Sequence, residues 1–247
     1  MDKGYTDLHS HILYETDDGS GSLEETINMI KALADAGFSA SCATPHNIPG
    51  NDNILLLSKS REKIRIIGET LEQQHIGYTI NTGAENYFDA SLEIKNPDYF
   101  IPLGNSETFL VEIPFIGETS HHIDALHKTG LHCIIAHVER YMDIVQNPDK
   151  ATVLKQAGFL LQMNFGSLIG VYGADVMKAA HVLLKKGIVD VIATDIHDIH
   201  HAGPILKKGM KRLETLLSPV KVNQVLRDNP SGILNRGYAT AASESKE

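Results

Sequence analysis

Short apolar runs alternate along this chain with longer segments whose apolar residues recur with a helical period. The apolar runs end near residues 11, 46, 82, 112, 136, 163 and 194, and the amphipathic segments lie between them. Regular alternation of strand and helix is typical of α/β proteins with parallel strands. We therefore expect an α/β fold in which one sheet of parallel strands forms a barrel.

The first predicted helix, within residues 23–36, has the strongest local signals. Ser22 and Glu25 form a capping box at its start, and Gly37 is a stop signal at its end. Its apolar stripe consists of Ile27, Ile30, Leu33 and Ala34, which should pack on the sheet. The same reasoning predicts further helices at about 55–75, 120–128, 148–157, 174–186, 204–217 and 220–227.

Composition limits the class of protein. A chain of 247 residues with 42% hydrophobic content can bury one core, and its net charge of −9 argues against a nucleic-acid partner. Cys42 and Cys133 lie in apolar runs and are expected to be core thiols rather than a disulfide, which favours a reducing compartment. Since no apolar run approaches the roughly 20 residues that span a bilayer, we expect a cytoplasmic protein that is not inserted in a membrane.

Residues of metal-ligand type follow the predicted strands. His9 and His11 are two apart on one strand and so point to one face, and Asp195 and His197 repeat this spacing after an apolar run. A lone His-x-His pair is more often two solvated side chains. In a parallel barrel, however, the carboxyl ends of all strands open on one face, so these residues should converge on a metal site.

Two carboxylates and two more histidines extend this set. Glu85 and Glu112 each close an apolar segment, and a buried carboxylate needs a metal or an ion-pair partner. Glu85 is the candidate to bridge two ions, because a carboxylate has two oxygens. His46 and His137 also follow apolar runs. In the first loop, either Asp17 or Asp18 could reach a third ion, although Asp-Asp-Gly alone is a turn signal.

Arg140 is the cation that the sequence brings nearest to these acids. Its planar fork of donors suits phosphate oxygens, and the alternative is an ion pair with Glu139 or Asp143. His200 and His201 lie close enough in sequence to the last ligands to contact substrate. The other histidines are expected to be solvated on helix or loop surfaces: His75, His121, His122, His127, His132 and His181.

Taken in order, the motifs resemble one family. They read Asp-Leu-His-Ser-His, Asp-Asp-Gly, Ala-Thr-Pro-His, Gly-Ala-Glu, Val-Glu-Ile-Pro, Ala-His-Val-Glu-Arg-Tyr, Gln-Met-Asn-Phe-Gly-Ser-Leu, Ala-Thr-Asp-Ile-His and Asn-Pro, over about residues 5–236. This set is similar to the bacterial capsular and exopolysaccharide tyrosine-protein phosphatases of the polymerase and histidinol phosphatase (PHP) superfamily. The resemblance implies a distorted seven-stranded (β/α) TIM-like barrel. Residues 1–237 would form this single domain, and residues 238–247 lack the apolar residues to stay ordered.

The resemblance also implies a site for three divalent ions, taken as manganese with iron or zinc as alternatives. His9, His11, Glu85 and Asp195 would hold the first ion, and Glu85, Glu112 and His137 the second. Asp18, His46 and His197 would hold the third, and Arg140 would contact the phosphate. Two departures stand out: Tyr14-Glu15-Thr16 replaces the usual Pro-Gly, and no further arginine follows His197, where His200 or His201 could substitute.

The expected activity is hydrolysis of phosphotyrosine, with a hydroxide that bridges the ions as nucleophile and a bacterial tyrosine kinase of capsule or exopolysaccharide synthesis as substrate. Neither cysteine begins a Cys-x5-Arg loop, because Ile48 and Glu139 stand where the arginine would be. A small-molecule phosphomonoesterase, such as a histidinol-phosphate phosphatase, and a non-catalytic metal-binding scaffold are the alternatives. The native metal and the oligomeric state stay open.

Overall fold

The computed structural model describes residues 3–92 and 99–236, so the predicted tail lies outside the described residues. The strands of this part are β1 Tyr5–Ser10, β2 Phe38–Ala43, β3 His46–Asn47, β4 Thr79–Thr82, β5 Glu85–Tyr87, β6 Thr108–Glu112, β7 His132–Ile135, β8 Leu160–Asn164 and β9 Val191–Ala193. The helices are α1 Leu23–Asp35, α2 Asn53–Gln73, α3 Thr119–His127, α4 Met142–Gln146, α5 Lys150–Gln156, α6 Ala174–Lys186, α7 Ile199–Leu216, α8 Pro219–Asn223 and α9 Asn229–Arg236. Short 3-10 turns, η2 Val138–Arg140 and η3 Phe165–Ile169, follow β7 and β8, and a π-helical turn, η4 Gln224–Asp228, joins α8 to α9.

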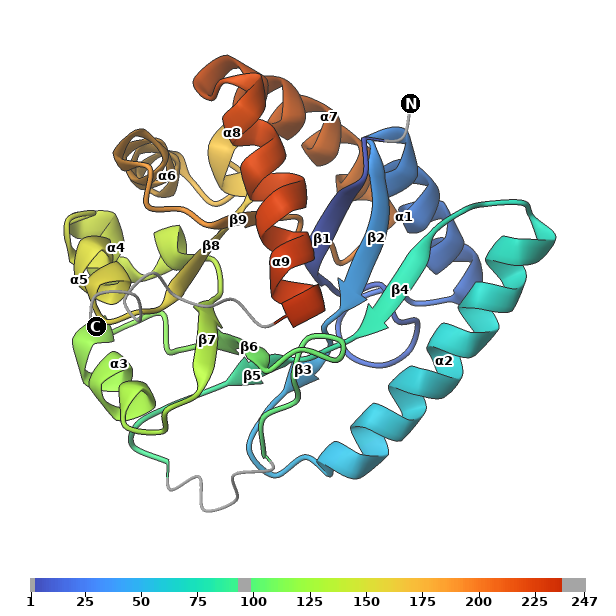
Figure 1. Ribbon diagram of the computed structural model, residues 1–247, viewed down its shortest axis with the longest axis horizontal. Helices are drawn as coiled ribbons and strands as arrows, with labels where there is room; N and C mark the ends of the chain where they lie inside the picture. The colour runs from blue at the N-terminus through green and yellow to red at the C-terminus, as the bar shows by residue number, and fades with distance from the viewer. Residues whose placement is uncertain (1–2, 93–98, 237–247) are drawn as a thin grey trace.

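The strands form a curled parallel sheet with the helices outside it (Figure 1). Three strands pair in the order β1-β2-β4, and six pair in the order β3-β5-β6-β7-β8-β9. One parallel bridge, between Ser10 and Ile196, connects β1 to the chain after β9. Every pairing between the described strands is parallel, so the carboxyl ends point the same way.

The parallel α/β architecture is confirmed, whereas an uninterrupted seven-stranded sheet is not seen. Thr44 and Pro45 separate β2 from β3, and Gly83 and Ala84 separate β4 from β5. At the first break, Pro45 has no N–H to donate to a neighbouring strand. At the second break, a side chain in place of Gly83 would put its Cβ only 3.0 Å from Leu103. At each break the chain leaves one sheet and continues in the other, which the apolar pattern did not indicate.

Helix α1 follows its sequence signals closely. The Ser22 hydroxyl accepts a hydrogen bond from the Glu25 N–H (3.1 Å), and the Glu25 carboxylate accepts one from the Gly21 N–H (2.9 Å). Ile27, Ile30 and Leu33 are buried against the sheet as predicted. The other oxygen of Glu25 accepts from the Ile199 N–H (3.3 Å), so α1 also satisfies the start of α7.

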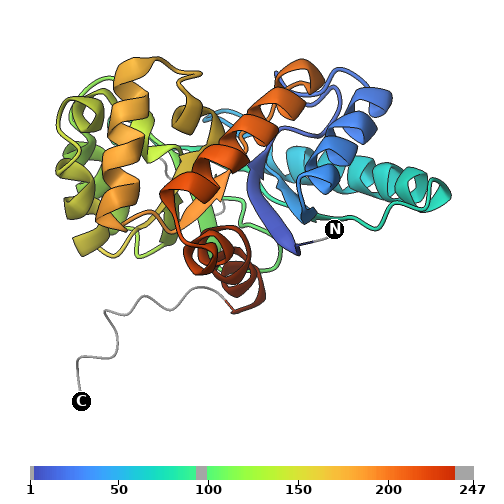
Figure 2. The ribbon, with the colours of Figure 1, turned by 90° about the horizontal axis from the view of Figure 1, so that it is seen from above.

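Three helices differ from the prediction, and one of them, the short helix α4, was not predicted. The helix predicted over about 204–217 would begin at Pro204. Instead α7 begins at Ile199 and Pro204 lies inside it. Helix α9 was not predicted at all. Its Ile233 belongs to a small apolar cluster with Leu8 of β1, Leu110 of β6 and other strand residues. Residues of distant strands can meet only on the side that the curled sheet encloses, so α9 covers one end of this interior. Figure 2 views the continuous run of α8, η4 and α9 (dark red) nearly end-on.

Both cysteines are buried and free, as expected for core thiols. Among the described helices, none combines the length and the apolar character that crossing a membrane requires.

Candidate metal centre

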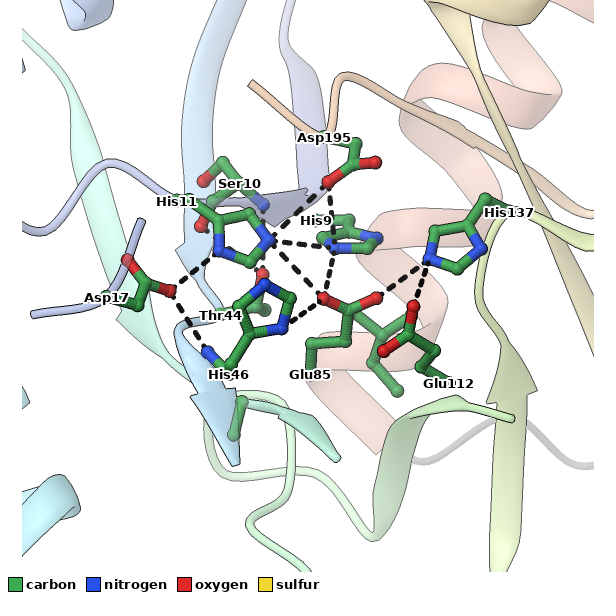
Figure 3. Close-up of polar contacts among 12 residues, drawn as sticks. His9, Ser10, His11, Asp17, Thr44, His46, Glu85, Glu112, His137 and Asp195 are labelled. Carbon is green, nitrogen blue, oxygen red and sulfur yellow. Dashed lines mark hydrogen bonds and ion pairs between the residues drawn. The ribbon is translucent and has the colours of Figure 1, made fainter. Parts of the chain in front are cut away.

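The carboxyl ends of the strands bring the predicted ligands together (Figure 3). His9 lies in β1 and Glu112 is the last residue of β6, whereas His46 and Glu85 are the first residues of β3 and β5, just after the breaks at which β2 and β4 end. His11, His137, Asp195 and His197 lie in the loops that directly follow β1, β7 and β9. Parallel strands therefore gather at one end the residues that the sequence spreads over 189 positions, from 9 to 197.

Glu85 is at the centre of this cluster. Its Oε2 atom lies 3.0 Å from His46 Nδ1 and 3.4 Å from His9 Nε2, and its Oε1 atom lies 2.9 Å from His137 Nε2. Burial alone would raise the pKa of Glu85, but His9 and the other imidazoles hold it well below its usual range. The two oxygens thus face different imidazole groups, which is the arrangement that a carboxylate shared between two cations requires.

A second acid, Asp195, faces the same two histidines of β1 and its loop. Its Oδ1 atom lies 3.3 Å from His9 Nε2 and 3.5 Å from His11 Nε2, and these two nitrogens are 3.2 Å apart. Burial lowers the pKa of His9, but Glu85 and Asp195 outweigh it and raise that pKa to about 9. Two imidazole nitrogens that point at one another and at shared carboxylates form a set that a divalent cation fits.

Three of these imidazoles are held so that Nε2 faces the cluster. The Nδ1–H groups of His9, His11 and His197 can donate to Gln162 Oε1 (3.1 Å), Asp17 Oδ2 (2.8 Å) and the Asp195 carbonyl (2.9 Å). An acceptor at Nδ1 fixes the tautomer and leaves the Nε2 lone pair free for a metal. This outer layer of acceptors is typical of histidines that bind metal ions.

The structure distinguishes Asp17 from Asp18. Asp17 accepts from His11 Nδ1, and from the backbone N–H groups of Gly19 (3.1 Å) and His46 (3.0 Å). Asp18 is more exposed, and its Oδ1 atom lies 3.3 Å from His46 Nε2 and 3.5 Å from His197 Nε2. Asp18 therefore has the position of a ligand, and Asp17 orients His11.

The loop that carries these acids is held from two sides. At Gly19 a side chain would place its Cβ 2.1 Å from the His11 carbonyl oxygen, so only glycine fits. From α2, the ammonium group of Lys63 donates to the carbonyls of Tyr14 and Glu15 and lies 4.6 Å from the centre of the Tyr14 ring. Glu15 has a left-handed backbone (φ 50°). Lys63 thus stabilises the loop of Tyr14, Glu15 and Thr16, and no motif in the sequence pointed to it.

Among the described residues, three groups of donors have ligand atoms within 4.8 Å of one another. They are His9, His11 and Asp195; His11, Asp18, His46 and His197; and His46, Glu85 and Glu112. The groups overlap with the predicted sets but differ from them in three ways. Glu85 is absent from the group of His9, His11 joins the group of Asp18, and His46 takes the place of His137 beside Glu112. His137 still lies 3.5 Å from Glu112.

Glu112 differs from Glu85 in its ionisation. Burial and the charge of Glu85 raise its pKa. Two neighbouring carboxylates cannot both ionise cheaply without a cation between them or near them. The acidic character of the site therefore favours a bound cation.

A polar chain on β8 connects several of the ligands. Gln162 Oε1 also accepts from the His137 N–H (2.8 Å), and Gln162 Nε2 donates to Asn164 Oδ1 (2.6 Å). Asn164 Nδ2 in turn donates to Asp195 Oδ2 (2.6 Å). The sequence showed these polar residues at a strand end but gave them no role. Gln162 and Asn164 thus position His137, which follows β7, and Asp195, which follows β9.

Arg140 lies at the rim of the site and contacts neither of the acids suggested as alternative partners. Its Nη1 atom lies 3.3 Å from Asp195 Oδ2, and its guanidinium is between the rings of Phe115 (4.8 Å) and Tyr172 (4.2 Å). Glu139 is instead buried and accepts from the Asn164 N–H (3.0 Å) and the Ser167 hydroxyl. Stacking on two rings fixes the guanidinium plane and leaves its other donors available for an oxyanion.

Two site residues have strained backbones. His137 has φ 31° and Asp195 has φ 52°, in the left-handed region that side chains with a Cβ rarely occupy. Such strain persists where the surroundings hold it, and it gathers at functional sites. The Nδ1 atom of His137 is also buried and has no hydrogen-bond partner.

Of the histidines predicted to be solvated, four are exposed and two are not, since His181 contacts the Leu168 carbonyl and His122 is buried. His75, His121, His127 and His132 are exposed, and His181 is half-buried. His122 was predicted to be solvated but is buried, and its Nδ1 accepts from the Ala90 N–H (3.1 Å). The side chain of His122 packs inward from α3. Helical spacing alone did not distinguish it from its exposed neighbour His121.

The two histidines suggested as substrate contacts belong to α7. His200 is exposed and does not line the cavity of about 280 Å³ at the ligand cluster. The side chain of His201 is not among those that the structure describes. Their suggested contact with substrate stays a prediction.

Comparison with known proteins agrees with this geometry. A family model described as capsular polysaccharide synthesis, CpsB/CapC, matches residues 5–235. CapC of Staphylococcus aureus is 30% identical over 211 residues, which cover 82% of this chain and 80% of that protein. Tyrosine-protein phosphatase CpsB of Streptococcus agalactiae is 24% identical over 246 residues, 94% of this chain and 99% of that protein.

Solved structures show the same fold. One comes from work on YwqE of Bacillus subtilis and CpsB of Streptococcus pneumoniae, described as unique metal-dependent tyrosine phosphatases. It matches with a TM-score of 0.79 at 24% identity and covers 95% of both chains. A phosphotriesterase homology protein of Escherichia coli matches with a TM-score of 0.60 at 14% identity, covering 94% of this chain and 98% of that one.

Proposed function

This chain belongs to the capsular polysaccharide synthesis family CpsB/CapC, and we propose that it is a metal-dependent phosphatase that hydrolyses phosphotyrosine in proteins. The observation that carries the proposal is the convergence of imidazoles and carboxylates on Glu85, with Arg140 at the rim. The relatives named as tyrosine-protein phosphatases support the substrate class.

The donor set suits borderline and hard divalent ions. It consists of imidazole nitrogens and carboxylate oxygens, and neither thiol takes part because both are buried elsewhere in the core. Such ligands suit manganese, iron and zinc. We infer three ions, preferably manganese: one with His9, His11, Glu85 and Asp195, one with Glu85, Glu112 and His137, and one with Asp18, His46 and His197.

Each part of the chain has a separate task in this proposal. When bound, divalent ions would lower the pKa of water and neutralise charge on phosphoryl oxygens. Arg140 would donate to the phosphoryl oxygens from a plane fixed by Phe115 and Tyr172, and stabilise the charge that develops there. The chain of Gln162 and Asn164 would keep His9 and Asp195 in place while charge moves.

The exposure of the site favours a macromolecular substrate. The side chains of Asp18, His46 and His197 are 66%, 33% and 31% exposed, whereas Glu85 on the inner side is 2% exposed. A phosphorylated side chain presented by a protein can reach such an open rim. We propose that the substrate is a phosphotyrosine-bearing bacterial tyrosine kinase that acts with capsule or exopolysaccharide synthesis, in the cytoplasm.

We also infer that the two sheets form one distorted seven-stranded barrel of the PHP type. Only two residues separate β2 from β3, and two separate β4 from β5, so each pair can count as one bent strand. The bridge between Ser10 and Ile196 would close the ring between its first and last strands.

The test is substrate comparison on protein saturated with manganese. We expect turnover of a phosphotyrosine peptide to exceed that of histidinol phosphate and to stop when a strong chelator is added. The reverse preference would instead indicate a small-molecule phosphomonoesterase. Metal binding without turnover of either substrate would indicate a non-catalytic scaffold.

A further inference from the structure

A second cavity adjoins the ligand cluster, between the chain after η3 and the start of α7. Its volume is about 210 Å³, and apolar side chains form much of its lining: Val171, Ile196, Ala202, Ile205 and Leu206. An apolar cavity of about 150 Å³ is enough to take up benzene. This space can therefore hold one aromatic ring.

The two cavities share three lining residues. Tyr172, Asp195 and His197 line both the apolar cavity and the cavity of the ligand cluster. The same Tyr172 ring stacks on the Arg140 guanidinium at 4.2 Å. A group bound beside Arg140 therefore lies next to the apolar cavity.

This position matches the chemistry of an aryl phosphate. In phosphotyrosine the ring is joined to phosphorus through a single oxygen, so the ring must lie directly beside the phosphoryl group. In phosphoserine only one methylene group follows that oxygen, so the cavity would stay empty and its apolar lining hydrated. Burial of a ring favours binding in proportion to the apolar area removed from water.

We propose that this cavity is the aryl subsite, which binds the ring of the phosphotyrosine and selects aryl over alkyl phosphate esters. The inference rests on the proposed function. It assigns the selectivity for aryl esters to the segment of Val171 and Tyr172 and to α7. The cluster of metal ligands binds the phosphate, and the apolar cavity distinguishes what the phosphate is attached to.

The test uses Val171→Trp and Ile205→Trp, each of which fills the cavity from a different side. Val171 is 48% exposed, so its replacement is compatible with folding even if the second variant is not. Lys208→Trp is the matched control, because Lys208 is an exposed residue of α7 that does not line the cavity. The probes are phenylphosphonate, methylphosphonate and inorganic phosphate, titrated into manganese-loaded protein.

We expect wild type and the control to bind phenylphosphonate at least about tenfold more tightly than methylphosphonate, because only the former buries a ring. Both filled variants should lose this preference but bind inorganic phosphate as wild type does. Equal affinity of wild type for the two phosphonates, or a preference that survives both substitutions, would overturn the subsite. Loss of the proposed function has a different signature: wild type would bind neither phosphate nor phosphonate and would not hydrolyse a phosphotyrosine peptide.

Discussion

Replacement of Arg140 by alanine separates binding of metal from binding of substrate. The guanidinium contacts Asp195 Oδ2 at 3.3 Å and lies over the rings of Phe115 and Tyr172, but it stays protonated and has no lone pair to offer a metal ion. We therefore expect Arg140→Ala to keep its metal content. Its phosphatase rate should fall, because the donors that face the phosphoryl oxygens are gone.

The size of this loss follows from the contacts. Removal of one charge-assisted donor from a preorganised site typically costs ~2 to 4 kcal/mol of transition-state stabilisation, which is about 30- to 1000-fold in kcat/KM. The side chain of Arg140 is 25% exposed and is held by two rings. It therefore has little mobility that would weaken its contact with the phosphoryl oxygens. Arg140→Lys should recover little of the rate, since a lysine has no planar fork to stack between the rings.

The assay is steady-state hydrolysis of a phosphotyrosine peptide at saturating manganese, together with metal analysis of the same samples. Arg65→Ala is the control, because Arg65 forms exposed ion pairs with Glu62 and Glu69 on α2. Wild-type kcat and KM in Arg140→Ala would refute the reasoning. Arg140 would then serve only as the structural partner of Asp195.

Three further predictions concern the rest of the site. Thiol alkylation of folded, metal-loaded protein should leave turnover unchanged, because burial raises the pKa of both thiols and neither lines the site; inactivation at full metal content would contradict this. Lys63→Met should weaken manganese binding about tenfold in a metal titration, because the loop of Asp18 loses two hydrogen bonds from one charged donor, whereas Lys59→Met on the same helix should not. His137→Ala should reduce metal per chain and rate, while His132→Ala, at the exposed start of the strand that precedes His137, should change neither; equal effects of the two would refute the assignment.

Local signals were enough to predict much of the fold. The cap of α1 and the bounds of α6 follow from Ser22, Glu25 and Gly187, since those residues act on their own neighbours. The breaks at Pro45 and Gly83, and the start of α7 at Ile199, depend on contacts with distant segments. Helix α9 is stabilised by burial of Ile233 in the interior of the curled sheet, which no local pattern indicates.

The candidate site, like the fold, could be predicted only in part from the sequence. Ligand types at strand ends could be found from sequence, because parallel strands bring their carboxyl ends together whatever lies between them. The residues that orient the ligands could not. Asp17, Gln162 and Lys63 act through hydrogen bonds to partners that are 6 to 153 positions away, and only the folded chain brings these groups together.

The most direct test of the central claim is a paired measurement on Glu85→Gln, with metal per chain and turnover of a phosphotyrosine peptide determined on the same protein. Glutamine keeps the shape of the side chain but removes the charge that faces His9, His46 and His137. The proposed metal centre predicts loss of bound metal together with loss of turnover, while thermal unfolding stays cooperative. Wild-type metal content and wild-type turnover in Glu85→Gln would contradict it.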